Sequence, residues 1–532
     1  MREQKSSLVA HLGLATLSLV LFLTFLDNTV VSATLANIQS SLHAGVAGLQ
    51  WVVNSYALVF ASFMLAAGAL SDLFGRKRIM LGGVAVFCAG SVLAALAPNI
   101  DVLIAARAVM GLGAAASEPG TLSMIRQIYR QPPARARALG IWAAVSGLAL
   151  AMGPLVGGTL VGLWSWRAVF WFNLFFGLIA FVAGALVLPE SKEPVRKRFD
   201  FGGLVFGAGA IALMAFAVMS GETHGYQTWW VVVLFVVGVV SLAAFLVAER
   251  RSPNPILNVG YFRRRAFAGA NVVALTSYFS IFSIFFFVAL YLQEVGSSSG
   301  YATALDFVPM AGGMVVAAIL TGRWVAAAGP RIPMIVGCLL SCAGIVVTVV
   351  LLTPHSTVST LGWALGLAGV GFGMVMVPVT ATGLSSIPAA HSGMAASMTN
   401  TSRELGAVAG VTILGSIVNG QLTVNLLARL TTIGIPKQFQ QLVVSAVTTG
   451  VISGESKKYT ALGGTISTIV KEVVQAAYGA FSHGLDISLG IAAGLMFASA
   501  LVAAWTMGGH EAAGGLGPAL EPDDERTDFS FL

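Results

Sequence analysis

Long apolar segments alternate with short polar ones along nearly the whole chain. A helix needs about 20 mainly apolar residues to cross the hydrocarbon core of a bilayer. Fourteen segments of about that length lie near residues 11–33, 51–70, 79–97, 101–122, 138–160, 167–188, 201–220, 229–248, 267–291, 302–323, 332–352, 358–380, 404–424 and 485–507. The pattern predicts an all-α integral membrane protein with fourteen transmembrane helices.

The first apolar segment resembles a secretory signal, because residues 31–33 have the form of a cleavage site. Asp27 and Asn28 interrupt its apolar region, and cleavage would remove both. We therefore expect an uncleaved first span.

The composition excludes a soluble protein. Of the 532 residues, 57% are hydrophobic and 10% are charged, whereas soluble domains carry about 25% charged residues. The three cysteines, Cys88, Cys338 and Cys342, all fall inside apolar segments and have no metal-ligand spacing. We therefore expect neither a disulfide framework nor a metal site.

Basic residues mark one side of the membrane. The short loops after even-numbered spans contain Arg76, Lys77, Arg78, Arg126, Arg130, Arg135, Arg137, Lys192, Arg196, Lys197, Arg198, Arg250, Arg251, Arg263, Arg264, Arg265, Arg323, Arg331 and Arg403. The short loops on the other side contain only Arg167. The positive-inside rule therefore predicts a multi-pass protein of the cytoplasmic (inner) membrane with both termini in the cytoplasm. Because the net charge of +7 is explained by these loops, it does not indicate a nucleic-acid partner.

An internal repeat divides the chain. Gly68 and Gly75 follow the second span, Gly322 and Gly329 follow the tenth, and both pairs are seven residues apart. Spans 1–6 and 9–14 are then equivalent six-helix halves, and spans 7 and 8 are an insertion without ionisable residues in their apolar stretches. Such pseudo-symmetric halves are typical of transporters that bind substrate between them.

These observations give four predicted regions. Residues 1–198 form the first bundle, 199–262 two inserted linker helices, and 263–507 the second bundle. The second bundle includes an external loop, 425–484, for which we expect surface helices packed on the outer face. Residues 508–532 form a polar acidic tail that we expect to be disordered in the cytoplasm.

Several motifs occur in a fixed order on these spans. They are Leu26-Asp27-Asn28-Thr29 on the first, Gly68-x-x-Ser71-Asp72-x-x-Gly75-Arg76-Lys77-Arg78 after the second, Arg107-x-x-x-Gly111-x-Gly113 on the fourth, Gly153-Pro154-x-x-Gly157-Gly158 on the fifth, Trp166-Arg167-x-x-Phe170-x-x-Asn173 at the sixth and Asn400-x-x-Arg403-Glu404 at the thirteenth. Together they resemble the fourteen-helix drug:proton antiporter branch of the major facilitator superfamily, over almost the whole chain.

The resemblance implies roles for these motifs. It implies a gating loop formed by Gly68, Asp72, Gly75, Arg76, Lys77 and Arg78, an antiporter motif formed by Gly153, Pro154, Gly157 and Gly158, and a proton-coupling role for Arg107. The chain departs from the family pattern at Ala149, Phe175, Ala326 and Glu404, and Glu118 is outside that pattern.

Asp27 and Arg107 are expected at similar depth in the membrane. Asp27 lies about 24 Å from the start of its span on one side, and Arg107 about 9 Å from the start of its span on the other. A lone buried carboxylate is costly and can exchange its proton for a cationic substrate. The alternative is a permanent structural pair between Asp27 and Arg107.

Glu118 follows Arg107 by eleven residues, which is about 20° beyond three helical turns and about 16 Å further along the axis. We expect both side chains to line one pathway. The alternative is that the fourth span ends early and Glu118 lies in the wet cytoplasmic mouth.

The remaining candidates have simpler alternatives. Asp72 is expected to dock on the N-terminus of a neighbouring helix as a gate, and the glycines near Pro154 to allow close packing and bending. Tyr278, Phe282 and Phe285 form one aromatic stripe that would contact substrate, or would pack in the core or against lipid. Asp306 is expected to be an interfacial charge, and Glu404 to stabilise the start of the thirteenth helix.

The sequence therefore predicts a proton-coupled antiporter that exports drugs or other amphipathic compounds by alternating access. An exporter of an endogenous lipid, peptide or metabolite is the alternative. We expect no enzyme, because no nucleophile–base or metal cluster occurs among the intramembrane polar residues. We expect no cofactor beyond the coupling proton, and a monomer whose partners are membrane lipids and amphipathic or cationic small molecules.

Overall fold

The computed structural model describes residues 2–42, 46–190, 200–252, 257–295, 300–353, 358–388, 391–433 and 464–507, with residues 44, 255, 356, 435–436, 438–440 and 444 between them. Over these residues the chain is helical and contains no strand. The predicted disordered tail, 508–532, lies outside the described residues.

The helices of the first half come in chain order. They are α1 (Arg2–Val30), η1 (Val31–Thr34), α2 (Leu35–Leu42), α3 (Val46–Phe74), α4 (Arg76–Ala95), α5 (Ile100–Ile128), α6 (Pro132–Leu163) and α7 (Arg167–Val187). The inserted helices are α8 (Phe201–His224) and α9 (Trp229–Arg251), followed by the short helix η2 (Val259–Arg263).

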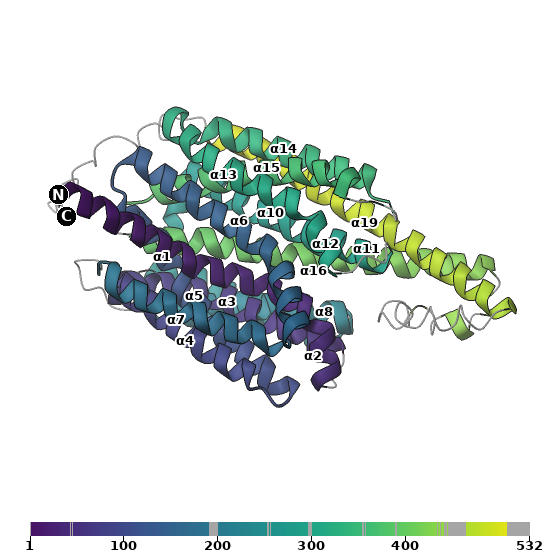
Figure 1. The fold of residues 1–532 in the computed structure, drawn as a ribbon. Coiled ribbons are helices and arrows are strands. Elements are labelled where there is room, and N and C mark those ends of the chain that lie inside the picture. The colour runs from purple at the N-terminus through teal and green to yellow at the C-terminus, as the bar shows by residue number, and fades with distance from the viewer. Residues whose placement is uncertain are drawn as a thin grey trace, which may run out of the picture.

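The second half begins with α10 (Arg265–Ser283). It continues with the π-helical η3 (Ile284–Val288), α11 (Ala289–Glu294), α12 (Gly300–Asp306), α13 (Val308–Ala328), α14 (Arg331–Leu351), α15 (Val358–Ser385), α16 (Ser392–Ile433) and α19 (Gly464–Thr506). Figure 1 shows these helices running side by side, with α16 and α19 extending beyond the rest.

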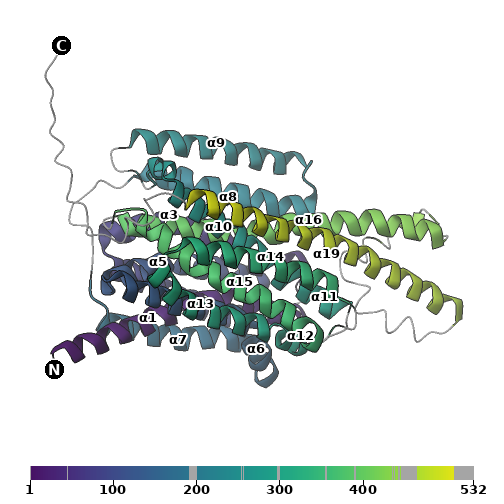
Figure 2. The ribbon, with the colours of Figure 1, turned by 90° about the horizontal axis from the view of Figure 1, so that it is seen from above.

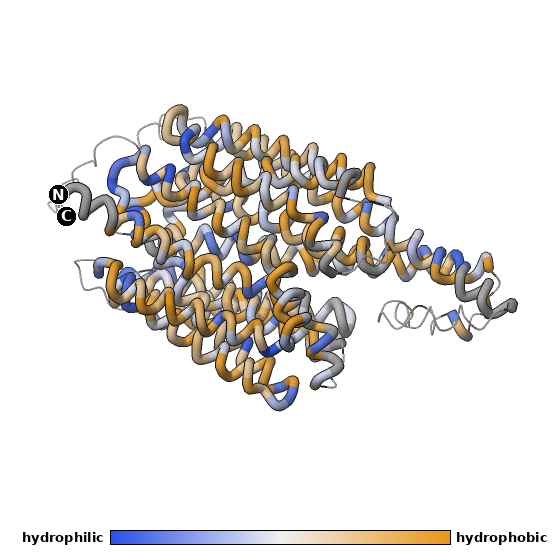
Figure 3. The backbone as a smooth tube through the Cα atoms, viewed as in Figure 1, coloured by the Kyte–Doolittle hydropathy of each residue, from blue (hydrophilic) through white to orange (hydrophobic). Residues whose placement is uncertain are grey.

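The described residues contain 12 helices long and apolar enough to span a membrane, and two further spans are bent. In α3 the segments Trp51–Met64 and Ala66–Phe74 meet at 51°, and in α6 the segments Pro132–Leu150 and Leu155–Leu163 meet at 46°. Counted as one span each, the bent helices raise the number to 14, which agrees with the all-α fold predicted from the apolar segments. Figure 3 shows apolar residues along the bundles and hydrophilic residues towards their ends.

The predicted start of the thirteenth span is wrong. The apolar segment begins at residue 404, whereas α16 begins at Ser392. Its first turns carry polar side chains that are buried inside the protein, such as Ser397, Asn400 and Arg403. Hydropathy misses this start because it reports contact with lipid, and these side chains face other helices.

The two halves repeat the same packing. In the first half, α5 packs against α3 and α4, and α4 packs against α7. In the second half, α15 packs in the same way against α13 and α14, and α14 packs against α19. Gly75 and Gly329 both have positive φ, 111° and 80°, and end α3 and α13. Equivalent residues after them make equivalent contacts, because Lys77 Nζ donates to Ala185 O over 2.7 Å and Arg331 Nη2 donates to Ala504 O over 3.0 Å.

Two symmetric helix pairs join the halves. α6 packs against α13 and α3 against α16. A Cβ on Gly140 would lie 2.9 Å from Ala318 O, and one on Gly322 would lie 2.8 Å from Ala136 O, so the first pair depends on small residues. α8 packs beside α3 and α16, and α9 lies outside α8 (Figure 2). Only 17% of the most apolar stretch of α9 is buried inside the protein, as expected for an inserted helix that faces lipid.

One end of the bundles carries the arginine-rich loops, and we call it the basic end. Arg126, Arg264 and Arg331 there donate to the carbonyl groups of Ile387, Ser386 and Ala504 respectively. At the opposite end α16 and α19 project away from the other helices (Figure 1).

This projection corrects the predicted external loop. Most of its described residues continue α16 and α19 and do not lie on the outer face as separate surface helices. The described residues 438–440 form a short helical stretch beyond α16, where Gln440 Nε2 donates to Ile435 O over 2.8 Å. An apolar seam holds the two helices together, formed by Leu422, Leu426, Leu430, Val473, Ala477 and Ala480. Residues 445–463 of the predicted loop lie outside the described residues.

Candidate transport site

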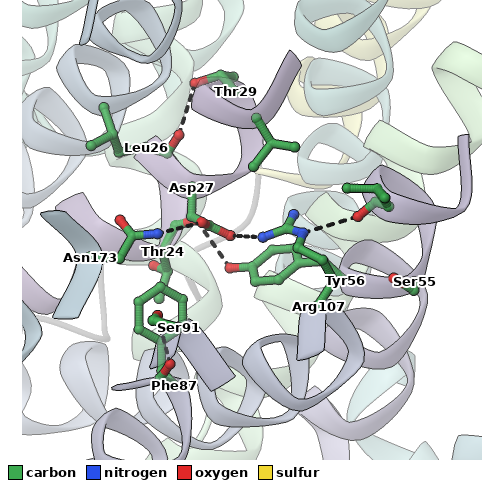
Figure 4. Close-up of polar contacts among 12 residues, drawn as sticks. Thr24, Leu26, Asp27, Thr29, Ser55, Tyr56, Phe87, Ser91, Arg107 and Asn173 are labelled. Atoms are coloured by element: carbon green, nitrogen blue, oxygen red, sulfur yellow. Dashed lines mark hydrogen bonds and ion pairs between the residues drawn. The ribbon is translucent and has the colours of Figure 1, made fainter. Parts of the chain in front are cut away.

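A buried ion pair lies within the first half. Asp27 on α1 and Arg107 on α5 are both 0% exposed. The Arg107 guanidinium donates to Asp27 Oδ2, and Asn173 Nδ2 on α7 donates to Asp27 Oδ1 over 2.6 Å (Figure 4). Both carboxylate oxygens are therefore satisfied, as a buried charge requires.

Arg107 is held by groups other than the carboxylate. Its Nε donates to Val52 O over 3.0 Å, and its guanidinium carbon lies 4.4 Å from the centre of the Tyr56 ring. The Tyr56 hydroxyl donates to Thr24 O over 3.1 Å, which ties α3 to α1. Arg107 thus keeps hydrogen-bond and cation–π partners if Asp27 becomes neutral.

Asp27 and Arg107 are predicted at similar depth, and in the structure they are in contact. No contact of Asn173 with Asp27 is predicted from the sequence, where Asn173 is only part of a motif. A signal was present, since Asn173 lies six residues after the start of α7 and Arg107 seven after the start of α5, from the same end. Counting depth does not give rotation, so it could not show which of these side chains face one another.

A second charged group lies between the halves. Glu118 on α5 is 1% exposed, Glu404 on α16 is 2% exposed, and the two carboxyl groups interact electrostatically. Arg403 also interacts electrostatically with both carboxyl groups. Glu118 is therefore buried and does not lie in a wet mouth, and Glu404, twelve residues into α16, does not stabilise a helix start as predicted.

Arg403 spans the interface. Its Nη1 donates to Asn400 Oδ1 over 3.0 Å, and its Nη2 donates to Thr380 Oγ1. The guanidinium carbon lies 5.4 Å from the Trp142 ring centre on α6 and 5.5 Å from that of Tyr278 on α10.

The predicted aromatic stripe on α10 is divided. Tyr278 and Phe282 stack with ring centres 6.1 Å apart, and Tyr278 also contacts Phe25 edge-on across the halves at 6.4 Å. Phe285 stacks instead on Phe307, at 5.0 Å. The π-helical segment Ile284–Val288 changes the helical phase at this point, which sequence spacing cannot reveal.

At the basic end, Asp72 joins the two halves. Its Oδ1 accepts from Arg76 Nη2 over 2.9 Å, and its Oδ2 accepts from the backbone N–H of Met394 over 3.2 Å, in the first turn of α16. Ser397 Oγ donates to Met64 O over 2.6 Å at the bend of α3. A carboxylate is favoured at a helix N-terminus, so these contacts hold the halves together at this end.

The other basic residues of the gating loop contact the first half only. Lys77 N donates to Glu190 Oε1 over 3.2 Å, and Arg78 Nε lies 3.6 Å from Glu190 Oε2. The Arg78 side chain is 78% exposed, so this pair contributes little to stability.

The antiporter motif lies at the bend of α6. Gly153 falls between the two segments that meet at 46°, and a Cβ on it would overlap Thr29 and lie 2.8 Å from Val30 N at the end of α1. Gly157 is buried, but Gly158 is exposed with nothing within 4 Å of a built Cβ. The expectation of close packing therefore holds at Gly153 and is wrong at Gly158.

Asp306 differs from the expected interfacial charge. It ends α12 just before α13 and is 5% exposed. Burial raises the pKa of its carboxyl group. α12 packs against α6, and Asp306 is buried where the sequence suggested an exposed charge at the membrane surface.

Two pseudo-symmetric helical bundles that meet along symmetric helix pairs, with charges buried between apolar helices, are the architecture of a membrane transporter. The sequence profile of the Major Facilitator Superfamily matches residues 17–411. The chain belongs to this family, which makes it a transporter rather than an enzyme.

Similar proteins agree with this assignment. The multidrug resistance protein Stp of Mycobacterium tuberculosis is 32% identical over 436 residues, 82% of this chain and 81% of that protein. The multidrug efflux pump LfrA of Mycolicibacterium smegmatis is 31% identical over 496 residues, 93% and 95% of the two chains. The human organic anion transporter MFSD10 has a similar fold, with a TM-score of 0.58 at 14% identity, covering 94% of this chain and all of that one.

Proposed function

We propose that this protein exports drugs or other amphipathic compounds across the cytoplasmic membrane in exchange for protons, with the basic end facing the cytoplasm. The names of the relatives support drug export. The observation that carries proton coupling is the fully buried Asp27, whose carboxylate oxygens bind Arg107 and Asn173 in an apolar bundle. An ionisable residue at such a position is a functional site by default.

The pair can change charge without unfolding the bundle. When a proton reaches Asp27, its attraction to Arg107 is lost, while Arg107 keeps the Val52 carbonyl and the Tyr56 ring. Losing one partner of a buried pair is costly because the other charge is left uncompensated, and the Val52 carbonyl and the Tyr56 ring stabilise the Arg107 guanidinium only in part. Protonation would therefore favour a rearrangement of the contacts among α1, α5 and α7.

Alternating access would follow from the two symmetric helix pairs. Opening the basic end requires the Asp72 carboxylate to leave the first turn of α16, and Arg126 to leave the Ile387 carbonyl. A helix-terminus contact of this kind contributes about 0.3–1 kcal/mol, more when partly buried. Such contacts are weak enough to be broken and remade in each cycle.

The same machine could export an endogenous lipid, peptide or metabolite. It would need no cofactor other than the proton and would work as a monomer within membrane lipids. Competition between each candidate and a dye substrate distinguishes these cargoes.

The test is dye transport in proteoliposomes under an imposed pH gradient. Asp27→Asn is expected to abolish gradient-driven transport while the protein remains folded and inserted. Asp101→Asn, which changes an exposed carboxylate in the first turn of the same α5, is the matched control and is expected to transport normally. Wild-type rates in Asp27→Asn would reject proton coupling through Asp27.

A further inference from the structure

In the first half, a carboxylate occupies the corner between the start of α4 and the end of α7. Glu190 follows the last residue of α7 by three positions. Its Oε1 accepts from the backbone N–H of Lys77 over 3.2 Å, and its Oε2 lies 3.6 Å from Arg78 Nε. A Cβ built on Gly75 would lie 2.8 Å from Glu190 Oε1. The chain therefore supplies its own anion to the basic residues of this corner.

The equivalent corner of the second half lies between the start of α14 and the end of α19. Arg331 corresponds there to Lys77, because each side chain donates to an alanine carbonyl in the last turn of the neighbouring helix. A Cβ built on Gly329, in the turn before Arg331, would meet no described atom within 4 Å. This corner is therefore open where its counterpart in the first half is filled.

A second guanidinium reaches the open corner from α10. The Arg265 guanidinium carbon lies 5.2 Å from the centre of the Trp505 ring. Trp505 directly follows Ala504, whose carbonyl group accepts the hydrogen bond from Arg331. Arg265 and Arg331 are both exposed, and neither has an ion pair within 4.0 Å in the described part of the chain. Two neighbouring cations without a counter-ion attract an anion.

The exposed surface beside this corner is apolar. On α19 the exposed side chains of Phe497, Leu501 and Trp505 follow one another at intervals of four residues. On α14 the exposed side chains of Ile332 and Leu339 are seven residues apart. Both spacings keep side chains on one face of a helix. Each helix therefore presents an apolar stripe to the lipid, leading from the basic end towards the middle of the bilayer.

The position of the corner indicates which anion it binds. Tryptophan at the end of an apolar stripe, with arginine beyond it, marks the level of the lipid headgroups. The positive-inside rule explains why arginines lie at this end, but not why two of them meet at one exposed tryptophan. An anionic lipid fits the corner better than a soluble anion, because its acyl chains also cover the stripes on α14 and α19.

We propose that Arg265, Arg331 and Trp505 form a binding site for the phosphate group of an anionic phospholipid, whose acyl chains lie on these two stripes. The phosphate takes the place that the Glu190 carboxylate takes in the first half. Guanidinium groups suit a phosphate because they donate two parallel hydrogen bonds to its oxygens. Since α10, α14 and α19 all belong to the second half, binding does not depend on how the halves are placed relative to each other, nor on the proposed export function.

The experiment measures quenching of Trp505 fluorescence by brominated lipid. Full-length protein is reconstituted into phosphatidylcholine bilayers that contain increasing fractions of phosphatidylglycerol brominated near the carbonyl end of its acyl chains. The contribution of Trp505 is the difference between each protein and its Trp505→Phe counterpart. Brominated phosphatidylcholine, measured in the same way, gives the reference for a lipid without net charge.

The wild type is expected to prefer phosphatidylglycerol to phosphatidylcholine at Trp505 by about twentyfold, for two arginines near the headgroup. Arg265→Gln and Arg331→Gln should each lower this preference about fivefold. Arg78→Gln is the matched control, because Arg78 is also exposed at the basic end but has Glu190 as its counter-ion. It should leave the preference unchanged, and melting temperatures verify that all variants are folded.

The outcomes separate the possible anions. An unchanged preference in both Arg265→Gln and Arg331→Gln would overturn the site, and an equal loss in Arg78→Gln would assign the preference to overall surface charge instead. Displacement of the lipid by inorganic phosphate, at constant ionic strength, would identify a soluble anion as the ligand. Tighter lipid binding by a full-length variant with amides in place of the acidic residues of 508–532 would identify the tail as the occupant. Either result would contradict the lipid site.

Discussion

At the residue scale, hydrogen bonding distinguishes the two acidic sites. Asp27 has both oxygens bonded within one half, whereas Glu118 has a buried oxygen without a partner at the interface between halves. The Tyr56 hydroxyl group interacts electrostatically with Asp27 as well as with Glu118 and Glu404. The two acids therefore differ in hydrogen bonding and in their position relative to the interface between the halves.

Asn173 should matter for coupling more than for folding. Asn173→Ala removes the only neutral donor to Asp27 among the described residues, which leaves Oδ1 without a hydrogen bond while Oδ2 keeps Arg107. We expect gradient-driven transport to fall about ten- to a hundredfold, because a charge-assisted hydrogen bond contributes about 1.5–3 kcal/mol. This loss is smaller than the one expected for Asp27→Asn. Transport assays on Asn173→Ala and Asp27→Asn, at matched protein amounts, check this order, and equal losses would contradict it.

The ionised carboxyl group of Asp306 should lower the free energy of unfolding at neutral pH. Because burial raises its pKa above the unfolded value of about 3.9, the folded state binds more protons than the unfolded state in the window above that value. Stability contributed by the neutral carboxyl is then lost as pH rises through the folded pKa.

Asp306→Asn is therefore expected to melt at a higher temperature than the wild type near neutral pH. The difference should disappear below about pH 4, where the Asp306 carboxyl group is protonated in both the folded and the unfolded protein. Thermal unfolding in detergent at several pH values measures it, and a pH-independent difference would point to a cause other than ionisation.

At the element scale, the proposed conformational change depends on the bends and helix ends. The bend of α6 places Gly153 against the end of α1, three residues beyond Asp27. The contact links the antiporter motif to the helix that carries the buried acid.

Gly153→Ala is expected to displace the end of α1, lowering both transport and the melting temperature. The new Cβ would overlap the Thr29 side chain and lie 2.8 Å from the backbone nitrogen of Val30. Because a backbone nitrogen and a Cβ cannot move by side-chain rotation, one of the two helices must shift. Gly158→Ala on the same helix is the matched control, because nothing lies within 4 Å of its Cβ. Equal effects of the two alanines would show that space at Gly153 is not the cause.

Asp72→Asn is expected to weaken closure of the basic end. The neutral amide loses the charge that favours the first turn of α16, worth about 0.3–1 kcal/mol. Spin labels at exposed positions 78 and 332, one in each half, report the separation in a cysteine-free background. The longer distance should gain population about two- to fivefold, and an unchanged distribution would contradict the gate.

Much of this element-scale picture follows from sequence. Lipid forces long apolar helices, so span positions, the repeated glycine turns at Gly75 and Gly329, and the similar depths of Asp27 and Arg107 were predictable. The start of α16, the π-helical shift in α10 and the burial of Glu404 were not. Each depends on which side chains face protein rather than lipid, and hydropathy along one chain does not contain that information.

At the scale of the whole molecule, the halves meet along two symmetric helix pairs, and the acidic sites occupy different positions relative to that interface. Asp27 lies within the first half, whereas Glu118 and Glu404 belong to opposite halves and would separate in the proposed cycle when the halves part. Opening at the basic end would break the contacts of Asp72 and disperse the carboxyl pair together.

The central claim is exchange of cargo for protons through Asp27. It is tested most directly by loading proteoliposomes with a pH-sensitive dye and imposing a gradient of a cationic substrate without a pH gradient. The account predicts that substrate flux moves protons in the opposite direction in the wild type and in Asp101→Asn, and moves none in Asp27→Asn. Substrate flux without proton movement in the wild type, or undiminished proton movement in Asp27→Asn, would contradict it.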